Sequence, residues 1–373
     1  MSNRCHVATR KGLFTFDRGN SGWAISHVSF LGDNCTLVMH DPRDGALLTA
    51  LDHGHFGVKM HRSHDGGATW QEIATPKYPE KPADYVPKTP PAEGKPADWS
   101  LKLIWALAPG GANEPGVVWC GTLPGGLFRS EDSGDSWELN RPLWDEPLRE
   151  EWSGGGADEP GIHSICVDPR DSSHVSVGVS IGGVWITRDA GKTWQICGEG
   201  MRAEYMPEGR QFDANVQDAH MLVQCPANPD ALWVQHHNGI FRSTDAAASW
   251  TEITDVNPSV FGFAVAVHPN DPDTAWFVPA VKDELRYPKD GKVVVNRTRD
   301  GSKTFDTLTN GLPQSHAYDL VFRHALDIDE SGERLMFGST TGSLWVTEDS
   351  GDSWQTLSSN LPPVYAVRFE KPA

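Results

Sequence analysis

The sequence predicts an all-β fold, a single seven-bladed β-propeller built from four-stranded blades. Three observations support this prediction: a repeated eight-residue phrase, strand-like runs at fixed positions around it, and chain ends that complement each other. The phrase is Ser or Thr, any residue, Asp, any residue, Gly, any residue, Ser or Thr, and an aromatic residue. Its near-copies are SHDGGATW (63–70), SEDSGDSW (130–137), TRDAGKTW (187–194), STDAAASW (243–250), TRDGSKTF (298–305) and TEDSGDSW (347–354), with a looser copy at 15–23. Self-similarity at a period near 50 residues indicates a repeat architecture.

Each copy of the phrase predicts a tight turn between two strands. The Asp carboxylate can accept hydrogen bonds from nearby backbone N–H groups, and Gly adopts positive φ at little steric cost. The closing aromatic ring is expected to pack between neighbouring repeats. Ala247 and Ser302 stand where Gly is expected, so we predict that these two turns are strained or differently shaped.

Short β-branched and aromatic runs bounded by Gly predict the strands. One run precedes each phrase, as in GGLFR (125–129), and a second lies upstream of it, as in GVVWCGT (116–122). A third lies further upstream, as in KLIWALA (102–108), and a short strand follows each aromatic residue. Four strands per repeat predict a propeller blade. The six complete blades are expected at 35–74, 101–140, 162–197, 218–254, 260–309 and 316–358.

The chain ends supply the seventh blade. The N-terminus offers CHVATR (5–10), GLFTFD (12–17) and GWAISHV (22–28), three strands without a first one, and the C-terminus ends on VYAVRF (364–369), a first strand without a blade. We therefore expect residues 363–370 to combine with residues 5–28, because closure removes exposed sheet edges. The whole chain, 1–373, is then predicted to be one domain.

Composition narrows the function classes. The net charge of −18 argues against a nucleic-acid partner or an anionic membrane surface. The first residues, MSNRCHVATRKG, lack the apolar run of a signal peptide, and no stretch is long enough to span a membrane. The six Cys occur singly, which predicts reduced, buried thiols in a cytoplasmic protein.

The repeated phrase resembles the Asp-box, or BNR repeat. Stretches such as GIHSICVDPRD (161–171) and QHHNGIFRSTD (235–245) look like those of bacterial Asp-box proteins described as sialidase-like or glycosyl-hydrolase-like. The resemblance implies the propeller, whereas chemistry must be argued from a site, because one fold serves many functions. True sialidase activity is not expected, since such enzymes typically have six blades and an Arg-Ile-Pro motif that this chain lacks.

The longest connections all fall on one face of the predicted propeller. Residues 75–100, 141–161, 198–219 and 280–292 extend connections opposite the repeated turns. Repeat proteins tolerate insertions where loops bind ligands. We therefore expect this face to be the binding face, with capping of the channel or dimerisation as the alternative role of the insertions.

Histidines gather on the same face. Three histidines are predicted to begin innermost strands: His163, His220 and His316. Four more lie in connections between second and third strands: His53, His55, His236 and His237. Imidazoles can act as a general base, clamp an anion, or bind a divalent metal as a cofactor. The alternative is that each ring only fixes the shape of its loop.

Carboxylates and aromatic residues complete the candidate site. Asp218, Glu150 and Glu151 are candidates for a catalytic pair, because glycoside hydrolysis uses two carboxyl groups. Tyr318 and Trp152 are candidates for ligand contact, with packing beneath the insertions as the alternative for Trp152.

The predicted function is binding of a small molecule or glycan at a His-rich channel mouth. If the protein is an enzyme, we expect a glycoside-hydrolase-like or metal-assisted hydrolase. The alternative is a non-enzymatic scaffold whose inserted loops bind a protein partner. A small-molecule site predicts a concave pocket with converging polar groups, and a scaffold predicts a broad surface with aromatic anchors.

Overall fold

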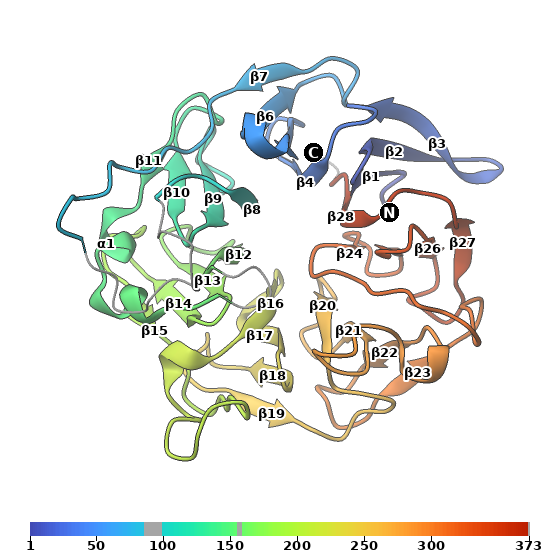
Figure 1. The fold of residues 1–373 in the computed structure, drawn as a ribbon. Coiled ribbons are helices and arrows are strands. Elements are labelled where there is room, and N and C mark those ends of the chain that lie inside the picture. The colour runs from blue at the N-terminus through green and yellow to red at the C-terminus, as the bar shows by residue number, and fades with distance from the viewer. Residues whose placement is uncertain (86–98, 155–158, 372–373) are drawn as a thin grey trace.

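The computed structural model describes residues 1–85, 99–154 and 159–371. It contains seven four-stranded sheets, and Figure 1 shows them arranged radially around a common centre. Each sheet pairs its strands in antiparallel order, from an innermost to an outermost strand. The predicted fold, an all-β seven-bladed propeller, is confirmed.

The strands occupy four equivalent positions in the blades. The innermost strands are β4 (Cys35–His40), β8 (Leu103–Pro109), β12 (Ile162–Val167), β16 (Ala219–Cys225), β20 (Gly262–Val267), β24 (Leu326–Ile328) and β28 (Val364–Phe369). The second strands are β5 (Leu47–Asp52), β9 (Val118–Leu123), β13 (Val175–Val179), β17 (Asn228–His236), β21 (Ala275–Pro279), β25 (Leu335–Gly338) and β1 (Arg4–Thr9).

The outer half of each blade is shorter in most repeats. The third strands are β6 (Val58–Ser63), β10 (Leu127–Ser130), β14 (Gly183–Thr187), β18 (Gly239–Ser243), β22 (Val295–Thr298), β26 (Leu344–Thr347) and β2 (Gly12–Gly19). The outermost strands are β7 (Gln71–Ile73), β11 (Glu138–Leu139), β15 (Gln195–Ile196), β19 (Thr251–Ile253), β23 (Asp306–Leu308), β27 (Gln355–Ser358) and β3 (Gly22–Ser29). The helices are one-turn elements in the connections: α1 (Arg141–Trp144), η1 (Gly54–Phe56), η2 (Pro147–Glu151), η3 (Ala214–Val216) and η4 (Lys289–Gly291).

The N-terminal and C-terminal strands close the ring, as predicted from the sequence. Strand β28 pairs with β1 in antiparallel register, with Val7 opposite Val367 and Ala8 opposite Ala366. The first and last strands of the chain, β1 and β28, therefore lie in one blade (Figure 1). Innermost strands of adjacent blades also contact one another all around the ring, including β28 with both β24 and β4. Closure thus leaves no innermost strand unpaired at the ends of the chain.

One innermost strand begins later than predicted. Residues 316–325 form no strand, and β24 begins only at Leu326. The backbone of His316 has φ 53, a left-handed conformation that interrupts an extended chain. The N–H of Ala317 instead donates to the carbonyl of Gly291, which fastens this segment to a connection of the preceding blade.

The repeated turns have the predicted hydrogen bonds. The Asp65 carboxylate accepts from the Thr69 N–H at 2.9 Å and from the Thr69 hydroxyl at 2.6 Å, while the Ser63 hydroxyl donates to the same carboxylate at 2.8 Å. The same set recurs around Asp132, Asp189, Asp245, Asp300 and Asp349.

The two turns without Gly keep the shape of the others. The N–H groups of Ala247 and Ser302 still donate to the hydroxyl that opens the turn, each at 3.0 Å. Their φ values are 66 and 78, in the left-handed region that disfavours a Cβ atom. The expectation of strain is therefore confirmed, and the expectation of a different shape is wrong, because the side-chain hydrogen bonds hold the turn.

The closing Trp of several phrases joins neighbouring blades. The indole N–H of Trp250 donates to the carbonyl of Cys197 at 3.2 Å, and that of Trp194 donates to Asn140 Oδ1 at 2.9 Å. Both acceptors belong to the preceding blade. Trp250 is only 4% exposed, whereas Trp194 is partly exposed. These residues therefore link the blades through both packing and hydrogen bonds.

The repeated turns predict an acid-sensitive fold. Hydrogen bonds from Thr69 and Thr193 lower the pKa of Asp65 and Asp189, respectively, from 3.8 to about 2. A carboxyl group whose pKa is lower in the folded state stabilises the fold above its unfolded pKa, and this stabilisation is lost as the pH falls through the folded pKa. We therefore expect the melting temperature to fall between about pH 4 and pH 2. Thermal unfolding at a series of pH values checks this, and Asp189→Asn should show a smaller fall over that range than the unaltered chain; an equal fall would contradict it.

Two further features complete the description of the chain. All six Cys are unpaired, and five of them are buried. No helix within the described ranges combines the length and the apolar character that crossing a membrane requires.

Candidate functional site

A cavity of about 650 Å³ opens at the centre of the ring. Every blade contributes to its lining, one residue from each being Asp52, Trp105, Ser180, His220, Phe263, Arg323 and Tyr365. Asp52 ends a second strand and Ser180 follows one, so the cavity lies on the face of the connections between second and third strands. The repeated turns connect third and outermost strands and hence lie on the other face. The structure thus places the cavity on the face where the insertions were predicted.

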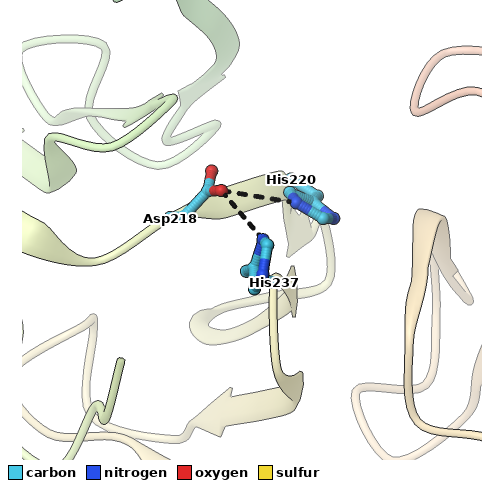
Figure 2. A group of neighbouring side chains, drawn as sticks. All are labelled: Asp218, His220 and His237. Atoms are coloured by element: carbon cyan, nitrogen blue, oxygen red, sulfur yellow. Dashed lines mark ion pairs between the residues drawn. The ribbon is translucent and has the colours of Figure 1, made fainter. Parts of the chain in front are cut away.

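Three of the predicted site residues meet in this cavity. Figure 2 shows the Asp218 carboxylate paired with both His220 and His237. Asp218 Oδ2 lies 3.5 Å from His220 Nε2 and 3.3 Å from His237 Nδ1. The side chains of Asp218 and His220 are 7% and 4% exposed, and that of His237 is 25% exposed. We refer to these three residues as the Asp–His cluster.

Strand pairing explains why the cluster forms. Ala219 in β16 lies opposite His236 in β17, so the residues just beyond this pair, Asp218 and His237, face each other. The N–H of His237 donates to the carbonyl of Asp218 at 3.0 Å, and the N–H of Asp218 donates to His236 Nε2 at 3.0 Å. The register shifts at His220, between Ala219 and Met221, which is a β-bulge. A bulge changes the direction in which a side chain points. This bulge lies at His220, whose side chain lines the cavity.

The two imidazoles favour the charged form of the Asp218 carboxylate. Burial acts to raise the pKa of Asp218, but His220 and His237 outweigh it and hold that pKa well below its usual value. Burial acts to lower the pKa of His237, but its hydrogen bond to Asp218 outweighs this and raises the pKa above 6.5. The cluster therefore presents a charged carboxylate beside two imidazoles. Such an arrangement can transfer protons or bind a divalent cation.

Packing fixes the ring of His220. Its Nδ1 lies 2.7 Å from the carbonyl oxygen of Gly262, and its ring stacks on Phe263 with centroids 4.5 Å apart. Because a carbonyl only accepts, Nδ1 carries a proton and donates it. The other nitrogen, Nε2, is the one near the Asp218 carboxylate.

An arginine just before β24 supplies the main cationic group of the lining. Arg323 Nε donates to the His220 carbonyl at 2.7 Å, and its guanidinium lies 4.4 Å from the ring centroid of Trp105. Burial lowers the pKa of Arg323 to about 10. Among the described residues, Arg323 has no carboxylate within ion-pair distance. Arg286, also in the lining, is paired with Asp283.

Two predicted histidines are buried outside the cavity lining. His163 bonds Ser164 Oγ through Nδ1 at 2.8 Å, and its carbonyl oxygen lies 2.7 Å from His324 Nε2. Burial lowers the pKa of His163 well below its usual value. His236 Nε2 accepts the hydrogen bond from the Asp218 N–H, and burial lowers the pKa of His236 to about 3. Both rings thus fix local structure, which was the stated alternative.

The other predicted residues also lie outside the lining of the cavity. His53 is partly buried beside Asp52, and His55 is exposed, with its ring against Phe56. Trp152 is 3% exposed and packs on Trp185, so its predicted ligand contact is replaced by core packing. The remaining residues are Glu150 and Glu151 in η2, of which Glu151 is exposed and accepts a hydrogen bond from Asn215.

The structure also corrects the positions of His316 and Tyr318. Both were predicted at the start of an innermost strand, near the channel. Both are exposed in the connection between β23 and β24, and Tyr318 is 64% exposed. The left-handed backbone of His316 and the later start of β24 are the physical reason. Residues 86–98 of the predicted 75–100 insertion and residues 155–158 of the predicted 141–161 insertion lie outside the described residues.

Comparisons with known proteins agree with the propeller. No family model matches the chain. An oligoxyloglucan-reducing end-specific xyloglucanase from Emericella nidulans is 28% identical over 273 residues, 68% of this chain and 32% of the relative. A probable enzyme of the same description from Neosartorya fischeri is 26% identical over 69% of this chain and 32% of the relative. The chain therefore spans about a third of the length of these curated relatives.

Solved structures show the same fold at low sequence identity. The GH74 xyloglucanase from Xanthomonas campestris matches with a TM-score of 0.65 and 17% identity, over 95% of this chain and 52% of that chain. The periplasmic gluconolactonase from Pseudomonas aeruginosa matches with a TM-score of 0.59 and 10% identity, over 98% of both chains. These similarities show the fold, and the curated relatives are described as xyloglucanases.

Proposed function

We propose that this chain binds a glycan or a small sugar-like molecule in the channel-mouth cavity, with hydrolysis at the Asp–His cluster as its reaction class. One observation carries the proposal: charged, polar and aromatic side chains from all seven blades line one cavity of about 650 Å³. This volume falls within the range of pockets for small molecules. The printed activity of the curated relatives favours a glycan over other small molecules.

The lining combines the groups that such a ligand requires. Leu103, Phe322 and Tyr365 provide apolar and aromatic surface, while Arg323 and Asp218 provide a hydrogen-bond donor and an acceptor. Binding sites of this type are largely apolar, with a few polar groups that orient the ligand. A carboxylate beside an imidazole with a raised pKa also suits acid–base hydrolysis.

Blocking the cavity provides the test. Leu103 is partly exposed at the start of β8 and lines the cavity, so Leu103→Trp places an indole in the proposed site. Against a panel of neutral and acidic oligosaccharides that includes xyloglucan fragments, calorimetry should show binding to the unaltered chain and at least about 100-fold weaker binding to this variant.

A matched variant controls for the added indole. Leu31 is 76% exposed in the connection between β3 and β4, outside the cavity lining, so Leu31→Trp should bind as the unaltered chain does. Equal affinity in Leu103→Trp, or no binding of any member of the panel, would contradict the proposal.

A protein-interaction scaffold is the second candidate. Seven of the nine large apolar residues that are exposed in the described chain lie in connections on the cavity face: Leu31, Phe56, Tyr205, Phe212, Leu285, Tyr287 and Tyr318. Exposed aromatic residues anchor protein partners. A partner recovered by the unaltered chain, and lost after Phe56→Ser and Phe212→Ser with oligosaccharide binding unchanged, would favour this function. Cytoplasmic location and membership of the Asp-box, sialidase-like family stay predictions from the sequence.

A further inference from the structure

We propose that Asp218, His220 and His237 form a binding site for a divalent transition-metal ion of the zinc type. The ligand atoms of these residues, one carboxylate oxygen and two imidazole nitrogens, all lie within 4.8 Å of one another. They lie at one end of the antiparallel β16–β17 pairing, so the backbone fixes their spacing before any ion arrives. This inference goes beyond the proposed function, because neither glycan binding in the cavity nor acid–base hydrolysis at the Asp–His cluster requires a metal.

The distances from the Asp218 carboxylate to the two imidazoles fit a tetrahedral ion. Zinc bonds to imidazole nitrogen and carboxylate oxygen are about 2.0–2.1 Å long, so tetrahedral angles place neighbouring ligand atoms about 3.3–3.4 Å apart. Asp218 Oδ2 lies 3.3 Å from His237 Nδ1 and 3.5 Å from His220 Nε2. An ion can therefore bridge Asp218 to either imidazole with little side-chain movement, and the two imidazole nitrogens lie within 4.8 Å of each other.

The outer contacts of His220 support the same conclusion. Histidines that bind a metal through one nitrogen usually donate the other N–H to a carbonyl or a carboxylate. His220 makes this contact through Nδ1, at 2.7 Å from the Gly262 carbonyl. Its other nitrogen, Nε2, is the one that lies near Asp218 Oδ2 and is therefore placed to bind an ion.

The ligand set selects the class of ion. Two imidazoles with one carboxylate suit zinc, iron, cobalt or nickel, whereas calcium and magnesium prefer oxygen ligands. Three protein ligands leave at least one coordination position open, as in catalytic zinc sites. Asp218, His220 and His237 all line the cavity, so that position would face the space where the ligand is proposed to bind.

Metal titration of the full chain tests the site. After treatment with a chelator, calorimetry with Zn²⁺ should show one tight site per chain. Co²⁺ should give the visible absorption of a tetrahedral nitrogen and oxygen site. His237→Ala and Asp218→Asn should each weaken the Zn²⁺ affinity at least about 100-fold, because each removes a direct ligand.

His174 provides the matched control. Its Nε2 lies 3.6 Å from Asp171 in a second His–Asp pair, which is remote from the cavity lining. His174→Ala should therefore keep the tight site. Circular dichroism and melting temperature verify the fold of each variant, and His237→Ala remains informative if the more buried Asp218→Asn fails to fold. Absence of tight Zn²⁺ binding by the unaltered chain, or unchanged affinity in His237→Ala, would overturn the proposal while leaving oligosaccharide binding as a separate result.

Discussion

Replacing Trp250 with alanine should lower the free energy of unfolding by about 3–5 kcal/mol, the range measured for large aromatic residues removed from protein cores. Trp250 closes a repeated turn and is 4% exposed. It packs in the apolar cluster that includes Met201, Phe241 and Ala247. Its N–H also donates to the carbonyl of Cys197 at the end of the preceding blade, so the variant loses both packing and an inter-blade hydrogen bond. Chemical denaturation monitored by fluorescence and circular dichroism measures the loss.

Tyr318→Ala serves as the control for removing an aromatic ring. Tyr318 is 64% exposed, so its replacement should change the free energy of unfolding by no more than about 0.5 kcal/mol. A near-neutral result for Trp250→Ala would contradict the role of the closing Trp in joining the blades. A large loss of unfolding free energy in both variants would instead show that the stability of the ring does not depend on how deeply an aromatic residue is buried.

Replacing Arg323 with methionine should weaken the binding of a cavity ligand about 10- to 100-fold. Hydrogen bonds to charged groups contribute about 1.5–3 kcal/mol, which corresponds to this range of affinity. Among the described residues Arg323 has no ion-pair partner, and it lines the cavity above Trp105. Calorimetry with the oligosaccharide that binds the unaltered chain best is the measurement.

Arg210→Met controls for the loss of a surface cation. Arg210 lies in a connection of the same face but is paired with Asp213 and is absent from the lining. Its replacement should leave the affinity unchanged. Because Arg323 also donates to the His220 carbonyl, the melting temperature of Arg323→Met must be measured alongside binding. Unchanged affinity in a folded Arg323→Met variant would remove this residue from the site.

The fold could be predicted because its signals are local and repeated. The hydrogen bonds around Asp65 involve residues within the same turn, so an eight-residue phrase specifies the turn wherever it occurs. Closure was also predictable, since the N-terminal segment offers three strands without an innermost one and VYAVRF is a first strand without a blade. The error at His316 arose because its apolar surroundings suggest a strand, while a left-handed backbone fastened to Gly291 prevents one.

The candidate site could be predicted only in part. Asp218, His220 and His237 lie close in sequence to one strand pair, so their convergence follows from the β16–β17 register. Arg323 was missed because the predicted strand began at residue 316. A signal was present: Asp168 follows an innermost strand, and Asp329, which follows β24, is similarly buried. Aligning these two Asp residues would have placed residues 323–328 in the innermost strand and Arg323 at the channel.

Most of the predicted histidines could not be assigned from sequence. His163 and His236 occur in strands that lead to the cavity, yet the buried His163 ring bonds the Ser164 hydroxyl and the buried His236 ring accepts from the Asp218 N–H. Whether a ring at a strand end faces the cavity or the core depends on bulges such as the one at His220. Such bulges leave no fixed pattern in the chain.

A structure of the chain with its best-binding oligosaccharide would test the central claim most directly. The proposal predicts a sugar in the channel-mouth cavity, within hydrogen-bond distance of Arg323 and next to Asp218 and His237. A sugar on the face of the repeated turns, or on the outer strands with the cavity holding only water, would contradict it.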